Sequence, residues 1–267
     1  MRVLVINLDR SPGRLAEFAA EAERCGLRFN RLAAIDGTAL SKQELDALTD
    51  SHFMFHPIKS GLVANYLSHR RAWQEAAAGS DRWTAIFEDD VRLGDDINEV
   101  LAAIEARDPD AGIIRLETTL RRVLVDEPGL PLTPGRSLHR MRSWHGGVAG
   151  YVIHRDCAQI LAAYSEKASG AADQVLFHPL SPLFSKLRVH QLIPGVVVQA
   201  SVLEPAGTSA ANTTTVWDQE ARGQRRLAVD LRWLGLKGLE RILRAYDRCW
   251  PGRSYRFIPF VRSTSAR

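Results

Sequence analysis

The chain has 267 residues, of which 45% are hydrophobic and 25% are charged. This composition is typical of a folded protein with a sizeable core, and it excludes a wholly disordered chain. No stretch approaches the roughly 20 apolar residues of a membrane-spanning helix, and charge soon interrupts the apolar run at the N-terminus. We therefore expect a protein that is neither secreted nor membrane-spanning.

The three cysteines, Cys25, Cys157 and Cys249, are widely spaced and odd in number. This argues against a disulfide framework, and the spacing is not that of a metal-binding cysteine motif. A reducing, cytoplasmic setting fits this pattern best.

The positive charge is concentrated at the C-terminal end. Residues 220–267 contain twelve Lys and Arg against four Asp and Glu, a balance of +8, which leaves −4 for residues 1–219 of the overall +4. Residues 206–215 are rich in Ser, Thr, Ala and Asn, as linkers often are. We predict a folded domain over residues 1–205, a linker over 206–219 and a basic C-terminal segment over 220–267.

Predicted strands and helices alternate along the first 200 residues, as in α/β folds. Strands are expected over residues 2–7, 28–35, 83–87, 112–117, 121–125, 148–154 and 194–199. Helices are expected from Pro12 to about Gly26, from the capping box Ser41–Glu44, and over residues 61–78, 95–106 and about 155–166. Residues 126–136, rich in Pro and Gly, are predicted to be a loop.

The predicted strand at residues 83–87 ends in three consecutive carboxylates, Glu88, Asp89 and Asp90. Ligands of open α/β sheets bind beyond the carboxyl ends of strands, and carboxylate oxygens suit Mg²⁺ or Mn²⁺, which can then hold a phosphate. Side chains alternate along a strand, so Glu88 and Asp90 share a face. Asp90 is the first-choice metal ligand. A solvated turn is the alternative interpretation of the same acids.

Asn65, Ser68 and His69 are three and four residues apart in the predicted helix 61–78, so they lie on one face. Polar groups that converge beside a carboxylate cluster favour ligand contact, although burial of the helix against the sheet explains the same pattern.

Asp9 and Arg10 follow the first predicted strand, and Asp36 follows the second, in Asp36-Gly37. These residues could contact a nucleotide from neighbouring strand ends, but Asp-Gly is also a turn signal, and from the residues alone we prefer the turn. Asp173 precedes an apolar run, where it could serve as a general base or cap a helix.

The C-terminal segment contains a basic amphipathic helix pattern over residues 236–250, with Lys and Arg opposite an apolar side. Aromatic residues among the arginines that follow favour contact with an anionic membrane surface, and packing on the body is the alternative. No motif supports nucleic-acid binding.

Four groups of residues together resemble glycosyltransferase family 25, and the likeness extends over roughly residues 2–202. They are Val5–Ser11, Ala34–Gly37, Gly61 with Ser68-His69 and Trp73, and Phe87–Val91. Asn65, where many relatives have cysteine, and Tyr66 depart from the family pattern. This family includes bacterial lipopolysaccharide and lipooligosaccharide glycosyltransferases and collagen galactosyltransferase domains.

The resemblance implies a GT-A-like α/β/α nucleotide-sugar-binding domain and inverting transfer of galactose or a related hexose from a UDP-sugar to a glycan hydroxyl. Asp90 would hold Mn²⁺ or Mg²⁺ against the diphosphate, and Asp173 would be the base. The donor would contact the remaining matched residues, which are Asn7, Asp9, Arg10, Asp36, Ser68, His69, Glu88 and Asp89. The acceptor would be a glycan or lipid-linked glycan, reached from the inner face of the cytoplasmic membrane.

Two other functions use the same residues. Carboxylates at strand ends also serve metal-dependent nucleotide phosphohydrolases, which need no acceptor. A non-catalytic nucleotide-sugar-binding scaffold would bind the donor without turnover. The presence of Glu88, Asp89, Asp90 and Asp173 favours an enzyme over the scaffold.

Overall fold

The structure is a computed structural model that describes residues 1–50, 59–164, 166–204 and 250–263, with the single positions 208, 238, 242 and 245. The predicted linker 206–219 and most of the predicted C-terminal segment 220–267 lie outside these residues. The boundary between domain, linker and tail therefore stays a prediction.

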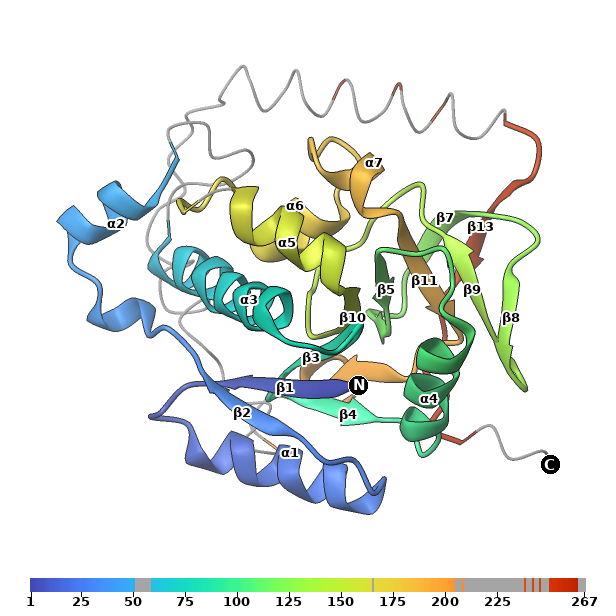
Figure 1. Cartoon of the computed structure of the whole chain (residues 1–267), viewed down its shortest axis with the longest axis horizontal. Coiled ribbons are helices and arrows are strands. Elements are labelled where there is room, and N and C mark those ends of the chain that lie inside the picture. Colours follow the sequence, from blue (N-terminus) through green and yellow to red (C-terminus); the bar gives the residue numbers. More distant parts are fainter. Residues whose placement is uncertain are drawn as a thin grey trace.

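In the described part of the chain, eight strands form one mixed sheet through the middle of the molecule (Figure 1). In sheet order they are β2 (Asn30–Ala33), β1 (Arg2–Asn7), β3 (Trp83–Glu88), β10 (Gly150–His154), β5 (Ile113–Arg115), β11 (Val189–Ile193), β9 (Arg136–Arg140) and β8 (Leu130–Thr133). The sheet and its flanking helices confirm the α/β fold predicted from the alternating sequence pattern.

The strand directions bring one set of strand ends together. Strand β3 is parallel to β1, and β10 lies antiparallel between β3 and β5. The carboxyl ends of β1, β3 and β5 and the amino end of β10 therefore lie at the same edge of the sheet. Polar residues at these four ends become neighbours although the sequence separates them widely.

Helices cover both faces of the sheet (Figure 1). The helical segments are α1 (Pro12–Arg24), η1 (Gly37–Ala39), α2 (Lys42–Leu48), α3 (Ser60–Ala78), α4 (Ile97–Arg107), α5 (Arg155–Tyr164), α6 (Ala172–Phe177), α7 (Phe184–Leu187) and α8 (Ala200–Leu203). Leu4 and Ile86 join the core beneath α3, α5 and α6, whereas the adjacent Val5 and Phe87 pack toward α1 and α4. The period-two alternation of the strands thus fills two apolar layers.

Two small sheets flank the main one. Strand β12 (Val197–Gln199) lies between β4 (Val91–Leu93) and β6 (Glu117–Thr118), and β13 (Arg253–Phe257) pairs with β7 (Arg122–Asp126). Strand β13 comes from the predicted C-terminal segment, so the end of that segment is part of the folded body. We call residues 250–263 the C-terminal strap, and its strand β13 lies beside β7 in Figure 1.

The structure corrects some predicted elements and confirms others. The capping box of Ser41 and Glu44 is present, and Pro12 begins α1, but the Ser11 side chain makes no capping hydrogen bond. The predicted loop 126–136 contains β8, an antiparallel partner of β9. Strand β8 lies at the edge of the sheet, where Pro131 is tolerated because an edge strand need not donate from every residue.

Candidate active site

The three acids predicted to form the site lie at the shared edge of the sheet. Glu88 is the last residue of β3, and Asp89 and Asp90 form the turn into β4. Asn7, the last residue of β1, donates from Nδ2 to Oδ2 of Asp89 over 2.6 Å. The parallel pairing of β1 and β3 explains this contact, because it places the two strand ends side by side.

The side chain of Arg14 bridges two of the acids. Its Nη2 lies 2.8 Å from Oδ1 of Asp89 and 2.7 Å from Oδ2 of Asp90. Arg14 projects from the first turns of α1 and is itself buried. Arg14 thus serves as an internal counter-ion for the carboxylate pair. Its single positive charge cannot fully balance two negative charges.

Asp90 keeps one oxygen without a partner. Its Oδ1 is buried and has no hydrogen-bond partner in the described part of the chain. Burial and the neighbouring Glu88 carboxylate together raise the pKa of Asp90 to about 7, against the opposing charge of Arg14. A cation would relieve this cost, because it favours the ionised carboxylate.

Glu88 is ionised by a different set of neighbours. Asn65 donates to its Oε1 over 2.8 Å, and Nε2 of the buried His69 lies 3.4 Å from the same oxygen. Burial alone would raise the pKa of Glu88, but His69, Asn65 and the Arg14 charge together bring it below its usual range. The predicted face of α3 therefore supplies two groups that hold Glu88 as a carboxylate.

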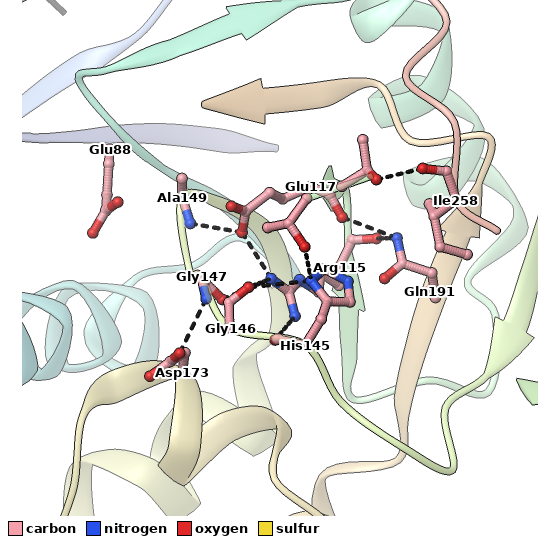
Figure 2. Close-up of polar contacts among 12 residues, drawn as sticks. Glu88, Arg115, Glu117, His145, Gly146, Gly147, Ala149, Asp173, Gln191 and Ile258 are labelled. Atoms are coloured by element: carbon pink, nitrogen blue, oxygen red, sulfur yellow. Dashed lines mark hydrogen bonds and ion pairs between the residues drawn. The ribbon is translucent and has the colours of Figure 1, made fainter. Parts of the chain in front are cut away.

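A second buried cluster is centred on Arg115, the last residue of β5 (Figure 2). Its Nη2 lies 3.0 Å from Oε2 of Glu117, and both side chains are fully buried. The guanidinium also donates to three successive carbonyl oxygens, those of His145, Gly146 and Gly147, over 2.7 to 2.8 Å. One cation thereby fixes the loop that leads into β10.

The same loop holds the predicted base. The amide of Gly147 donates to Oδ2 of Asp173 over 3.0 Å, and the amide of Gln174 donates to Oδ1 over 2.9 Å. Burial raises the pKa of Asp173 above its usual range, although the Gly147 amide opposes the shift. Figure 2 shows the Asp173 carboxylate beside Gly147 of this loop.

A carboxylate cluster at the carboxyl ends of β1, β3 and β5 occurs in several classes of enzyme, so the sequence relationship decides between them. The model of glycosyltransferase family 25, described as a lipopolysaccharide biosynthesis protein, matches residues 1–176. The chain belongs to glycosyltransferase family 25. This confirms the resemblance drawn from the sequence motifs, and it identifies the protein as a glycosyltransferase.

Two family relatives align over most of their length. A lacto-N-neotetraose biosynthesis glycosyltransferase, LgtB, of Neisseria meningitidis is 31% identical over 73% of this chain and 74% of its own. The lipooligosaccharide biosynthesis protein lic2B of Haemophilus influenzae is 30% identical over 75% of this chain and 77% of its own. A solved glycosyltransferase involved in glycosylation of the major capsid of PBCV-1 is 13% identical, with a TM-score of 0.38 over 79% of this chain and 95% of its own.

Several residues that the family resemblance places around the donor lie in other surroundings. Asp9 is exposed and forms an ion pair with Arg31, and Arg10 donates from Nε to Oδ2 of Asp36 over 2.5 Å. Asp36 also accepts from the amide of Thr38 and so caps the N-terminus of η1. Arg31 also donates to Oδ1 of Asn7 over 2.9 Å, so Asp9 is linked through Arg31 and Asn7 to Asp89. The contacts of Arg10 and Asp36 make no such link, and the role of all three residues toward the donor stays a prediction.

Ser68 also has a structural task. Its hydroxyl donates to the carbonyl of Ala64 over 2.7 Å and accepts from the amide of Ile35 over 2.9 Å. The residue thus fastens the segment after β2 to α3. Its place in the donor pocket stays a prediction.

Arg14 and the pair Arg115 and Glu117 were not predicted from the sequence. A signal for the pair was present, because the run Gly112-Ile-Ile-Arg-Leu-Glu117 places two opposite charges at alternate positions of an otherwise apolar strand. Alternate residues share a face, so two charges there must be paired or solvated. Arg14 gave no such signal, because a helical arginine is ordinarily a surface residue.

The structure also bears on membrane and metal binding in the described residues. None of the helices there is both long enough and apolar enough to cross a bilayer. In the same part of the chain, no three His, Cys, Asp or Glu side chains are grouped so that they could hold a metal ion by themselves.

Proposed function

We propose that this family 25 protein transfers a hexose, galactose or a relative, from a UDP-sugar to a hydroxyl of a glycan acceptor, with inversion at the anomeric carbon. The observation that carries the proposal is the unpartnered buried Oδ1 of Asp90 at the carboxyl end of β3, where ligands of open α/β sheets bind. Family membership supports the sugar-transfer chemistry, and the names of the Neisseria and Haemophilus relatives support a lipooligosaccharide acceptor.

A divalent cation fits this site with Asp90 as its one protein ligand. Mg²⁺ and Mn²⁺ suit oxygen donors, and Mg²⁺ commonly uses one or two carboxylates and completes its shell with water and substrate phosphates, so a preformed cluster of three side chains is not required. Asp90 has a buried oxygen without a hydrogen-bond partner, and its pKa is raised. Both features indicate a carboxylate that lacks a sufficient positive counter-charge. When bound, Mn²⁺ or Mg²⁺ would offset the negative charge that develops on the departing diphosphate.

The remaining residues of the site hold its carboxylates in position and supply the base. Asn7 and Arg14 hold Asp89 and Asp90 in place, and Asn65 with His69 holds Glu88. Asp173 accepts the proton of the attacking hydroxyl, and its burial raises its pKa toward the range in which a general base works best near neutral pH. The Gly147 and Gln174 amides fix the direction of that carboxylate.

The transfer assay uses UDP-hexoses with Mn²⁺ and an oligosaccharide acceptor, and the anomeric configuration of the product is read by NMR. We expect an acceptor-dependent product with inverted configuration, and we expect Asp173→Asn to reduce kcat by about 10²-fold or more. Release of sugar phosphate or phosphate at the same rate without acceptor would favour the phosphohydrolase alternative. Tight UDP-sugar binding without any turnover would favour the scaffold.

We also propose that the protein works in the cytoplasm, with the basic segment over residues 236–250 at the inner membrane face. That segment lies largely outside the described residues, and its support is the sequence pattern. The test replaces four basic residues with Gln, namely Lys237, Arg241, Arg244 and Arg248. Co-sedimentation with anionic vesicles should fall sharply in this variant, and unchanged sedimentation would contradict the proposal.

A further inference from the structure

A chain of hydrogen bonds inside the molecule ends on Glu88. Nε1 of Trp73 donates to the Tyr151 hydroxyl over 2.8 Å, and that hydroxyl lies 3.0 Å from Nδ1 of His69. The other ring nitrogen of His69, Nε2, lies 3.4 Å from Oε1 of Glu88. Trp73 and His69 come from α3 and Tyr151 from β10, so the chain joins the helix layer to the sheet.

The direction of these bonds follows from their donors and acceptors. An indole N–H can only donate, so the Tyr151 oxygen accepts from Trp73. Burial raises the pKa of Tyr151 well above its ordinary value, so the hydroxyl keeps its proton. All three side chains have 0% exposure, and His69 is the remaining polar partner of this hydroxyl in the described part of the chain. The hydroxyl must therefore donate to Nδ1, because a buried donor left unpaired is costly.

The tautomer of His69 follows. Nδ1 accepts and carries no hydrogen, so Nε2 carries it and donates to Glu88. In the opposite tautomer, the N–H groups of Trp73 and His69 would both point at the Tyr151 oxygen, and the hydroxyl proton would have no acceptor. The lone pair on Nε2 would then face the Glu88 carboxylate. Each of these changes is unfavourable in a buried site.

We propose that Tyr151 and Trp73 are positioning residues that fix His69 as the Nε2–H tautomer, so that His69 and Asn65 together orient the Glu88 carboxylate. Both of these donors meet at Oε1. Within the described residues, Oε2 has no hydrogen-bond or ion-pair partner, which leaves it to accept a hydroxyl of the transferred sugar. The sugar contact rests on the proposed function, whereas the tautomer does not.

The first test observes the ring nitrogens of His69 by ¹⁵N NMR, with the signals assigned by their loss in His69→Asn. Wild-type protein should show a protonated Nε2 and an unprotonated Nδ1 at neutral pH. Tyr151→Phe removes the donor to Nδ1, and its His69 signals should shift toward a mixture of tautomers. A protonated Nδ1 in the wild type would overturn the proposal.

The second test separates orientation of Glu88 from general damage to the fold. Tyr151→Phe should lower kcat/KM for sugar transfer by about tenfold, as expected for loss of one hydrogen bond that positions a charged group. Its affinity for UDP alone should stay within about twofold of the wild type, since UDP lacks the sugar. Tyr164→Phe, at the end of α5, is the matched control and should change neither value.

The positioning role of Tyr151 and the proposed sugar transfer can be contradicted independently. If UDP affinity falls as much as kcat/KM in Tyr151→Phe, the residue is structural and the positioning role is wrong. If the wild type shows the Nε2–H tautomer but transfers no sugar from any UDP-hexose, the positioning network stands and the proposed function fails.

Discussion

Nη2 of Arg115 lies 3.0 Å from Oε2 of Glu117, and neither side chain has any exposed surface. Removing one partner of such a pair leaves an uncompensated buried charge, whereas replacing both with apolar residues can be nearly neutral. This ion pair also anchors the loop 145–147, which in turn contacts Asp173. This one pair of residues therefore affects both the stability of the fold and the geometry of the proposed base.

At pH 8, above the Glu117 pKa of about 7, Arg115→Met should lower the free energy of unfolding by about 3–5 kcal/mol, because it leaves the buried Glu117 carboxylate without its counter-charge. The double substitution R115M/E117L should recover a large part of that loss. Urea unfolding of the two variants and the wild type measures both quantities. If the double variant is no more stable than the single one, the loop contacts of Arg115 outweigh the ion pair.

Glu117 gives the free energy of unfolding a pH dependence of predictable sign. Burial raises its pKa from the usual 4.5 to about 7, against the opposing charge of Arg115. Between these values the unfolded chain releases the proton and the folded one keeps it. A rise in pH through this window therefore destabilises the native state, by up to about 1.4 kcal/mol per pH unit for one group.

The corresponding measurement is urea unfolding of the wild type and Glu117→Gln at several values between pH 5 and 8. The variant lacks the titrating group, so its stability relative to the wild type should improve steadily up to about pH 7 and then level off. Parallel curves for the two proteins would contradict the assignment of this pKa to Glu117.

Position 147 requires a glycine. Its φ is +98°, and a Cβ at this position would lie 2.5 Å from Oε1 of Glu117. Gly147→Ala should cost about 2 kcal/mol or more of stability and displace the amide that holds Asp173. Gly79→Ala, at an ordinary φ of −73° after α3, is the control and should cost much less, because its Cβ would lie 3.3 Å from the nearest atom, the carbonyl oxygen of Glu75. Equal stability of the two variants by thermal unfolding would show that the loop adapts to a side chain.

The C-terminal strap is part of the body. Ile258 is fully buried, and its carbonyl accepts from Oγ1 of Thr118, the residue after Glu117, over 2.5 Å. Ile258→Ala should cost about 2–5 kcal/mol, whereas Phe257→Ala, at a side chain with 47% exposure, should cost much less. Chemical unfolding compares these neighbours directly. Similar losses at both positions would contradict the packing of the strap.

This packing changes how the membrane proposal is tested. Deleting residues 220–267, the truncation suggested by the charge pattern, would also remove β13 and the buried Ile258. Loss of activity after such a deletion would report a damaged fold. Substitution of the basic residues within 236–250 leaves the strap in place and is the appropriate experiment.

Much of the fold could be predicted because local patterns agreed with the tertiary structure. The apolar run at Trp83–Phe87 and the helical period over residues 61–78 appear as β3 and α3. Strands β9 and β11 escaped prediction, since polar residues such as His139 and Gln191 occupy buried positions within them. Their identity as strands depends on long-range pairing, which no local pattern contains.

The candidate site was predictable in part for the same reason. Glu88, Asp89 and Asp90 follow one strand directly, so the chain order reveals them. Arg14 contacts them from a helix, and Glu117 reaches the same edge only because β10 lies between β3 and β5. Contacts of this kind depend on sheet order, and a single sequence does not specify that order.

The central claim is that Asp90 holds a divalent cation against the diphosphate of a UDP-sugar. Isothermal titration of UDP with and without Mn²⁺ tests it directly, with Asp90→Asn as the variant and Asp110→Asn, at an exposed carboxylate outside the site, as the control. We predict Mn²⁺-dependent UDP binding in the wild type and in Asp110→Asn, and its loss in Asp90→Asn. Equal Mn²⁺-dependent affinity in Asp90→Asn and the wild type would contradict the claim.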